Sequence, residues 1–518
     1  MRVIKIFLLF VCCISLDVQS QTFLSDTLGI NEDGSVIIAK SLALPGWILG
    51  VDVDSTDNLL FIRYRNLSKN ETSLKNRGGI SVYSLADQRM LWQRPVNYFN
   101  QDPKLTSEGV LFVTMGKATS LLDLKTGNEV WKKKKMIPYW VDAKNRMFLA
   151  YKGSYMNGVS NELEGHSLAT GEKMWSRKMS HVYGWNESGL LDDSTRLIVS
   201  DGIHLVHMGN GEGPSYAMPT GASDYKEAVA LGALGVVTGV LTGFAAVPTG
   251  PKKVMELVSN VLSDDTVFYV ASRENLFCLD RQLQPKWGYP IPDGMGSRSH
   301  LFARGDSLYM INMGTGYRNT IFDTSEAYAH EYLRLKVGWP FIACFDKRKG
   351  EKVWFRQLSD KKEMVEEFAL MVLFSDHIRK YSLSGDSLLS EVSWDTEVNG
   401  KLLYLTNSSY FLQDFGDSTS YQRYKRPDSI YCLITDKNEM VELDQQLNVL
   451  QTYPLSKLRT FKALPNGDNL IFLGDKTLWV NSKGEKKAYL YTSSKMFRVD
   501  EKFFIYSLDG KKIYEFPL

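Results

Sequence analysis

The sequence predicts an all-β fold, a β-propeller of eight to ten four-stranded antiparallel blades. The phrase LDLKTGNEVW at Leu122–Trp131 returns as HSLATGEKMW at His166–Trp175, and both copies carry Thr-Gly followed by Trp. Weaker copies recur along the chain, most of them about 35–45 residues apart. Each copy has the composition of a β-hairpin, and a β unit repeated at this spacing is typical of propeller blades.

Nine copies of the phrase align. Five end in Trp, and the degenerate ones keep the strand–turn–strand pattern without that Trp. The copies that end in Trp close at Trp92, Trp131, Trp175, Trp287 and Trp354. The degenerate copies lie at Val206–Tyr216, Lys380–Leu389, Glu442–Gln451 and Trp479–Ala488.

Within each copy, an alternating strand runs into a turn rich in Asp, Thr, Lys and Gly. We expect Gly127, Gly171 and Gly350 to supply the positive φ that such turns need. A more apolar strand such as VLFVTMG or TVFYVAS precedes most hairpins, which indicates a strand covered on both faces. With a variable innermost strand, these pieces make a four-stranded blade.

The five recurrent Trp residues fall on the outer strand of their units. We expect them to wedge between neighbouring blades and to bury a large apolar area there, rather than to form a ligand cage. These predicted blade-docking residues are Trp92, Trp131, Trp175, Trp287 and Trp354.

The last unit supplies only three strands before the chain ends. The segment GSVIIAKSL at Gly34–Leu42 is a spare strand, and we expect it to complete the final blade as its outer strand. This pairing would close the ring and leave no free seam. Residues 21–518 are therefore predicted to form a single propeller domain.

Residues 1–20 have the pattern of a secretory signal peptide. Arg2 and Lys5 precede the apolar run Ile6–Ile14, which is too short for a stable membrane span. The sequence therefore predicts an exported protein.

The copies at Leu122–Trp131 and His166–Trp175 resemble the repeats of the pyrroloquinoline-quinone-type (PQQ-like) propeller superfamily. That superfamily includes quinoprotein alcohol dehydrogenases and the outer-membrane assembly lipoprotein of Gram-negative bacteria. Quinoproteins carry an adjacent-cysteine disulfide over the cofactor, whereas the adjacent cysteines here, Cys12 and Cys13, lie in the predicted signal peptide. The resemblance therefore implies a propeller of the non-catalytic branch with no cofactor, and it leaves lipidation open.

Charge and cysteine content exclude several classes of protein. The formal net charge is +2, so the chain offers no global field for nucleic acid. The basic run Lys132–Lys135 is typical of a solvated edge-strand end. Cys278, Cys344 and Cys432 lie in strand-like runs and are predicted to be buried thiols.

The sequence contains no recognisable catalytic or metal-binding motif. His204 and His207 are close together, but a strand would point them to opposite faces, and no further ligand accompanies them. A nucleophile elbow, a P-loop and a dinucleotide fingerprint are all missing from the sequence. We therefore predict no catalytic and no metal-ligating residue.

One apolar segment interrupts the repeats. Ala228–Pro251 carries no charge over 24 residues, within an insertion at 226–252. Its glycines at four-residue spacing would form a smooth stripe on a helix, a pattern that promotes helix pairing in lipid. We weigh a segment packed on its own protein, a membrane or partner contact, and a span of the bilayer. The candidate contact residues are Gly235, Gly239, Gly243 and Phe244.

The sequence therefore predicts a non-enzymatic scaffold or accessory subunit of a bacterial envelope complex, in the periplasm or at the outer membrane. Its partners would be envelope proteins, and a small-molecule ligand is left open. Asp-Ser and Asp-Thr triplets such as those at Asp26, Asp193 and Asp417 resemble acceptor sites of a periplasmic O-glycosylation system. Two alternatives remain: a propeller enzyme (quinone- or metal-dependent oxidoreductase, or hydrolase) with its site in the central channel, and a glycan- or peptide-binding module.

Overall fold

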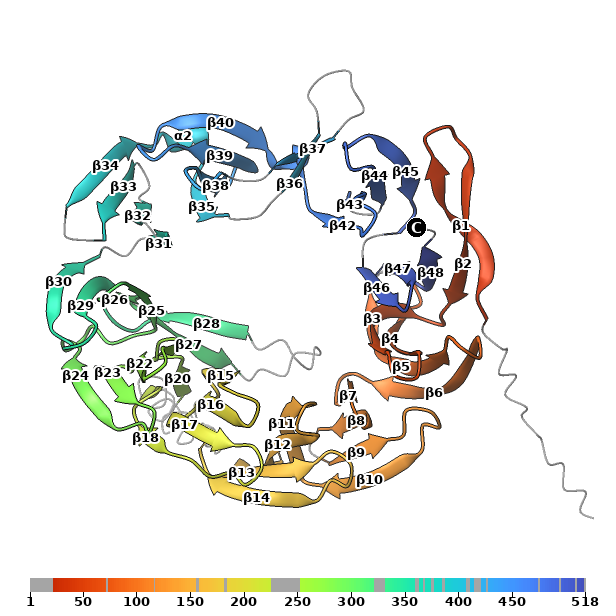
Figure 1. The fold of residues 1–518 in the computed structure, drawn as a ribbon, viewed down its shortest axis with the longest axis horizontal. Coiled ribbons are helices and arrows are strands. Elements are labelled where there is room, and N and C mark those ends of the chain that lie inside the picture. The colour runs from red at the N-terminus through yellow and green to blue at the C-terminus, as the bar shows by residue number, and fades with distance from the viewer. Residues whose placement is uncertain are drawn as a thin grey trace, which may run out of the picture.

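Antiparallel sheets follow one another round a ring in the computed structural model of the chain (Figure 1). The structure describes residues 22–516 except 71–72, 116, 155–157, 181–183, 225–251, 321–330, 359–362, 367–368, 374–376, 384–386, 407–409, 414–420, 425–426, 474–475, 493–494 and 508–509. Helical structure within these residues is limited to α2 (Thr396–Asn399) and the 3-10 turn η1 (Leu455–Lys457).

Six sheets each consist of four strands that are consecutive in the chain, as expected for up-and-down blades. The first sheet contains β3 (Trp47–Asp54), β4 (Leu59–Leu67), β5 (Leu74–Ser84) and β6 (Arg89–Asn97), and the second contains β7 (Gln101–Thr106), β8 (Gly109–Thr114), β9 (Ala118–Leu122) and β10 (Glu129–Lys134). The third contains β11 (Met136–Asp142), β12 (Met147–Ser154), β13 (Gly158–Ser167) and β14 (Lys173–Lys178), and the fourth contains β15 (Glu187–Leu190), β16 (Thr195–Val199), β17 (Gly202–His207) and β18 (Ser215–Ala217). The fifth contains β21 (Leu262–Ser263), β22 (Val267–Ala271), β23 (Asn275–Asp280) and β24 (Pro285–Pro290), and the sixth contains β31 (Glu363–Glu366), β32 (Ala369–Leu373), β33 (His377–Ser382) and β34 (Leu388–Ser393).

Two further four-stranded sheets are interrupted by insertions. The first contains β25 (Ser299–Arg304), β26 (Ser307–Asn312), β29 (Phe341–Asp346) and β30 (Lys352–Gln357), and the second contains β35 (Leu402–Leu405), β38 (Tyr431–Thr435), β39 (Glu439–Leu443) and β40 (Val449–Pro454). The inserted strands pair with strands from elsewhere in the chain and form two further sheets. One has the order β37 (Tyr421–Tyr424), β36 (Tyr410–Gln413), β41 (Leu458–Arg459), and the other joins β19 (Ala222–Asp224), β20 (Lys252–Met255), β27 (Thr315–Thr320) and β28 (Glu331–Lys336).

The two ends of the chain meet in one nine-stranded sheet. Its order is β42 (Phe461–Ala463), β43 (Asn469–Phe472), β44 (Thr477–Val480), β45 (Lys486–Leu490), β1 (Leu24–Asn31), β2 (Val36–Ala43), β48 (Lys512–Phe516), β47 (Lys502–Tyr506), β46 (Lys495–Val499). The strand predicted at Gly34–Leu42 is β2, and it pairs with β48 as expected, with Leu42 opposite Ile513. The pairing of β1 with β45 was not predicted, and it makes the N-terminal hairpin span two sets of strands.

The repeated phrase forms the hairpin that was predicted. In the copy before Trp131, the Asp123 carboxylate accepts hydrogen bonds from the backbone N–H and the hydroxyl of Thr126, both at 2.7 Å. Gly127, Gly171 and Gly350 have φ of 71°, 66° and 74°, which confirms the expected left-handed turns. The Trp-bearing strands β6, β10, β14, β24 and β30 lie on the outside of the ring (Figure 1).

The core lies between neighbouring sheets. All five side chains of β22 are buried, as predicted for an apolar strand covered on both faces. All five side chains of β9 are buried as well, although this strand was expected to alternate between buried and exposed residues. One apolar cluster joins Phe61 of β4 to Phe112 of β8, so neighbouring sheets share one core. Cys278, Cys344 and Cys432 are free and buried, and burial raises the pKa of the Cys278 thiol to about 11.

Candidate functional site

Trp175 on β14 contacts the neighbouring sheet through a turn glycine. Its indole N–H donates to the carbonyl of Met208 at 2.7 Å. A Cβ on Gly211, whose φ is 76°, would overlap the indole ring, so a residue without a side chain is required there. The same arrangement recurs twice, for Trp92 with Leu124 and Gly127, and for Trp131 with Leu168 and Gly171.

The later copies replace this hydrogen bond. The ring of Trp287 packs on Gly350, but its buried indole N–H has no hydrogen-bond acceptor among the described residues. The Tyr269 hydroxyl donates instead to the carbonyl of Lys347, three residues before that glycine, at 3.3 Å. In the next unit the indole N–H of Trp354 is likewise unpaired, and the Tyr309 hydroxyl donates to the carbonyl of Leu383 at 2.9 Å.

The apolar insertion lies largely outside the described residues. Gly235, Gly239, Gly243 and Phe244 all fall within 225–251, so the structure places none of them. Elsewhere along the described chain, no helix has the length and apolar character needed to cross a membrane.

The strands that flank this insertion belong to an auxiliary sheet, β19–β20–β27–β28, which also contains the strands flanking residues 321–330. Asp224 pairs with Lys252 at the end of the β19–β20 hairpin, and Thr320 pairs with Glu331 at the end of the β27–β28 hairpin. Because β20 and β27 are antiparallel, with Val254 opposite Arg318, both connecting segments leave this sheet at the same end. Figure 1 shows β28 directed towards the middle of the ring.

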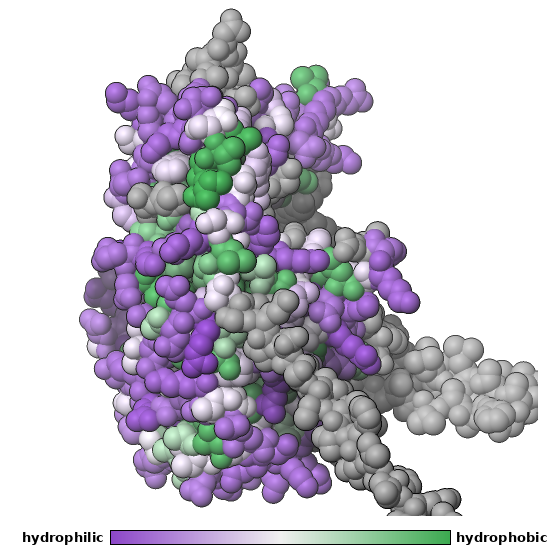
Figure 2. Space-filling view, turned by 90° about the vertical axis from the view of Figure 1, so that its right-hand side faces the viewer, coloured by the Kyte–Doolittle hydropathy of each residue, from purple (hydrophilic) through white to green (hydrophobic). Residues whose placement is uncertain are grey.

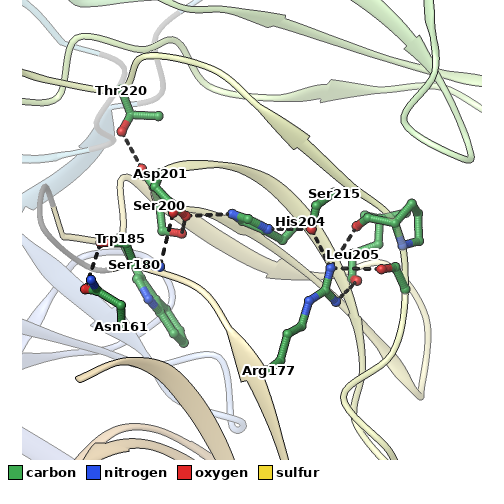
Figure 3. Close-up of polar contacts among 12 residues, drawn as sticks. Asn161, Arg177, Ser180, Trp185, Ser200, Asp201, His204, Leu205, Ser215 and Thr220 are labelled. Atoms are coloured by element: carbon green, nitrogen blue, oxygen red, sulfur yellow. Dashed lines mark hydrogen bonds and ion pairs between the residues drawn. The ribbon is translucent and has the colours of Figure 1, made fainter.

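A polar network connects β14 with β17 and β18 (Figure 3). His204, which is buried, contacts the Asp201 carboxylate through Nε2 at 3.0 Å and the Ser215 hydroxyl through Nδ1 at 2.8 Å. The Arg177 guanidinium donates to the same Ser215 hydroxyl at 2.5 Å and to four backbone carbonyls. Those carbonyls belong to Leu205, Gly211, Gly213 and Pro214.

The network is electrostatically satisfied. Burial alone would raise the pKa of Asp201. The hydrogen bond and the charge of His204, together with hydrogen bonds from the Ser180 N–H and the Ser200 hydroxyl, lower this pKa by more than burial raises it, so the net shift is downward. Ser215, His204 and Asp201 have the order of a nucleophile, base and orienting acid. Arg177 also holds the Ser215 oxygen, and its other hydrogen bonds tie β14 to the β17–β18 turn. The arrangement therefore fastens neighbouring sheets.

The sequence did not indicate this network. HLVH at His204–His207 drew attention only as a metal motif, and the structure buries His204 and exposes His207, in keeping with opposite faces. Among the described residues, no group of three His, Cys, Asp or Glu side chains could hold a metal ion. Arg177 carried no signal, because its acceptors are four backbone carbonyls and the Ser215 hydroxyl, all of them distant in the sequence.

Comparison with known proteins identifies the repeats. Residues 50–284 match the family model of the outer membrane protein assembly factor BamB. No match was found among curated proteins.

Among solved structures, BamB from Moraxella catarrhalis is 11% identical, with 75% of this chain and 96% of that chain covered at a TM-score of 0.31. Apo AztD from Citrobacter koseri is 9% identical over 73% and 92%, with a TM-score of 0.30. Sqt1 from Saccharomyces cerevisiae is 7% identical over 91% and 99%, also at 0.30. Similarities of this size carry no argument about function. Residues 50–284 therefore carry PQQ-like propeller repeats of the kind described by the family model of the outer membrane protein assembly factor BamB.

Proposed function

We propose that this chain is an exported, non-enzymatic propeller that serves as a binding scaffold or accessory subunit of a bacterial envelope complex. The observation that carries the proposal is the match of residues 50–284 to the family of an outer membrane protein assembly factor. From that family we transfer only the class of role: protein partners, and a location in the periplasm or at the outer membrane. The signal-peptide pattern at residues 1–20 supports export.

The scaffold in this proposal is one closed ring of ten blades. The eight four-stranded sheets of consecutive or interrupted type account for eight of them. The nine-stranded sheet supplies two more, β42–β45 and β46–β48 with β2, and its hairpin joins them. Each of the five Trp side chains would dock its own blade on the next one, and the contacts of Trp92, Trp131 and Trp175 support this role.

The partner contact in this proposal is the insertion at 226–252, through Gly235, Gly239, Gly243 and Phe244. Two observations support this contact: Ala228–Pro251 contains no charged residue, and the strands that flank the insertion belong to the auxiliary sheet β19–β20–β27–β28. An apolar segment of this length on an exported protein must be covered by the rest of its own chain, by a partner protein or by a lipid surface.

A mild-detergent pull-down of the tagged protein from its native envelope tests this proposal. It would be compared with a variant in which residues 226–251 are replaced by a short Gly-Ser turn, which keeps the β19–β20 hairpin. The matched control replaces residues 321–330, the other connecting segment of the same sheet. A membrane-protein partner lost only with 226–251 supports the proposal. Recovery of the intact protein alone and soluble contradicts it.

A further inference from the structure

An open pocket at one end of the first blade is lined by several cationic side chains. It has a volume of about 880 Å³ and lies between the tip of the β4–β5 hairpin and the link from β6 to β7. Its described lining residues include no Asp or Glu, and they are Arg65, Ser73, Leu74, Lys75, Asn76, Arg77, Asn97 and Phe99. We propose that this pocket binds an acidic segment of a partner protein.

Arg65 forms the fixed part of the pocket. A Cβ on Gly78 would lie 2.6 Å from the Arg65 Cα, so glycine lets β4 and β5 approach closely where their register shifts. The Arg65 guanidinium lies 5.3 Å from the ring centre of Tyr98, whose hydroxyl is anchored on the carbonyl of Gly79 at 2.8 Å. The Nε of Arg65 is buried and has no hydrogen-bond acceptor among the described residues. A buried, unpaired guanidinium N–H needs an acceptor from outside this set.

Lys75 and Arg77 form the exposed part. They are two residues apart on β5, so their side chains share one face of the sheet. Both are exposed, and in the described part of the chain neither forms an ion pair. Asn97 lies opposite Arg77 on β6, and its side-chain oxygen already accepts from the Phe99 N–H at 3.2 Å, which leaves its amide N–H groups to donate. All these groups favour an anionic ligand.

The ligand must also offer apolar groups. Leu74 is 36% exposed and Phe99 is 42% exposed, and both line the same pocket as the cations. A free inorganic anion would leave these side chains in water. A peptide that carries carboxylates beside apolar residues would satisfy both parts, and an open pocket accepts a continuing chain.

The pocket lies at the end of its blade from which the auxiliary sheet also arises elsewhere in the ring. It opens where the second strand, β4, turns into the third, β5, and where the fourth strand, β6, leads to the next blade. The auxiliary sheet arises from the same two kinds of connection, after β18 and after β26. Antiparallel order brings both kinds of connection to the same end of the strands. The pocket and the auxiliary sheet therefore share that end, and the inference deepens, and rests on, the proposed scaffold function.

The test is fluorescence anisotropy with the purified full chain and a fluorescein-labelled peptide of alternating Glu and Leu. We expect the double variant Lys75→Glu/Arg77→Glu to bind at least about tenfold more weakly, since each removed charge pair is replaced by repulsion. The matched control, Lys134→Glu/Lys135→Glu, makes the same charge change in the dense basic run and should bind like the unchanged protein. Phe99→Ser, which keeps all charges, should also weaken binding.

Three results would overturn the inference: equal weakening in both double variants, equal binding of a Gln-Leu peptide, or displacement by inorganic phosphate at the concentration of the peptide. The first would mean diffuse attraction, the second an apolar surface, and the third a small-anion site. Thermal unfolding of each variant checks that it folds. Because only purified protein is used, failure here is distinguishable from failure of the envelope pull-down.

Discussion

The indole N–H of Trp175 donates a 2.7 Å hydrogen bond to the carbonyl of Met208 across the boundary between two neighbouring sheets. The ring then covers Gly211, which has a left-handed backbone. One side chain thus supplies both apolar burial and a hydrogen bond at this boundary. Each phrase of Thr-Gly followed by Trp therefore contains a turn that receives the Trp of the preceding unit and a Trp that docks on the turn of the next unit, as Gly127 with Trp92 and Trp131 with Gly171 show.

Substitution of the receiving glycine should be more costly than substitution of a glycine in a free turn. Gly211→Ala forces a methyl group into the Trp175 ring, whereas a methyl group added at Gly294, which has a similar φ of 74°, would meet nothing within 4 Å. We expect Gly294→Ala to lower the free energy of unfolding by about 1 kcal/mol and Gly211→Ala by about 3 kcal/mol. Urea unfolding measures both, and equal losses would contradict the docking role of Trp175.

The missing hydrogen bond at Trp354 should be measurable. Trp175→Phe and Trp354→Phe remove the same volume, but only Trp175 loses a hydrogen bond, because the Trp354 N–H has no acceptor in the described part of the chain. We expect the first variant to lose about 1 kcal/mol more than the second. Tyr309→Phe, which frees the carbonyl of Leu383, should itself lose about 1 kcal/mol. If both Trp variants lose the same amount, the two docking modes are energetically alike.

The N-terminal hairpin should stabilise the ring through one face only. Ile37 is 8% exposed and packs in a cluster with Leu470 and Tyr514, from both parts of the nine-stranded sheet, whereas Ile38 is 57% exposed. Figure 2 looks onto the side that carries the hairpin and shows hydrophobic residues in separate patches among hydrophilic neighbours. We expect Ile37→Ala to cost about 2–4 kcal/mol and Ile38→Ala less than about 0.5 kcal/mol. If neither substitution changes the free energy of unfolding, the hairpin does not contribute to the stability of the fold.

Local pattern predicted the units of this fold, and long-range pairing was not predictable from it. The hairpin around Gly127 and the strand at Gly34–Leu42 were foreseeable, because strand alternation, turn glycines and an unfilled blade leave signals in short segments. The auxiliary sheet was not, because it pairs residues 254–255 with 317–318 from two insertions that share no period with the repeats. The replacement of Trp287 by Tyr269 as hydrogen-bond donor was hidden too, since both residues fit their strands equally well in sequence.

Acid should weaken the boundary that Asp201 helps to hold. The pKa of its carboxyl lies below the ordinary value of 3.8 in the folded protein, so the carboxylate stabilises the fold above that pH and loses this contribution as the pH falls through the folded pKa. Asp201→Asn should therefore be less stable at neutral pH and should lose less stability between about pH 5 and pH 2. Ser215→Ala keeps the Asp201–His204 pair and should retain the acid response of the unchanged protein. Thermal unfolding across this pH range measures all three proteins, and an unchanged acid response in Asp201→Asn would show that other carboxylates dominate it.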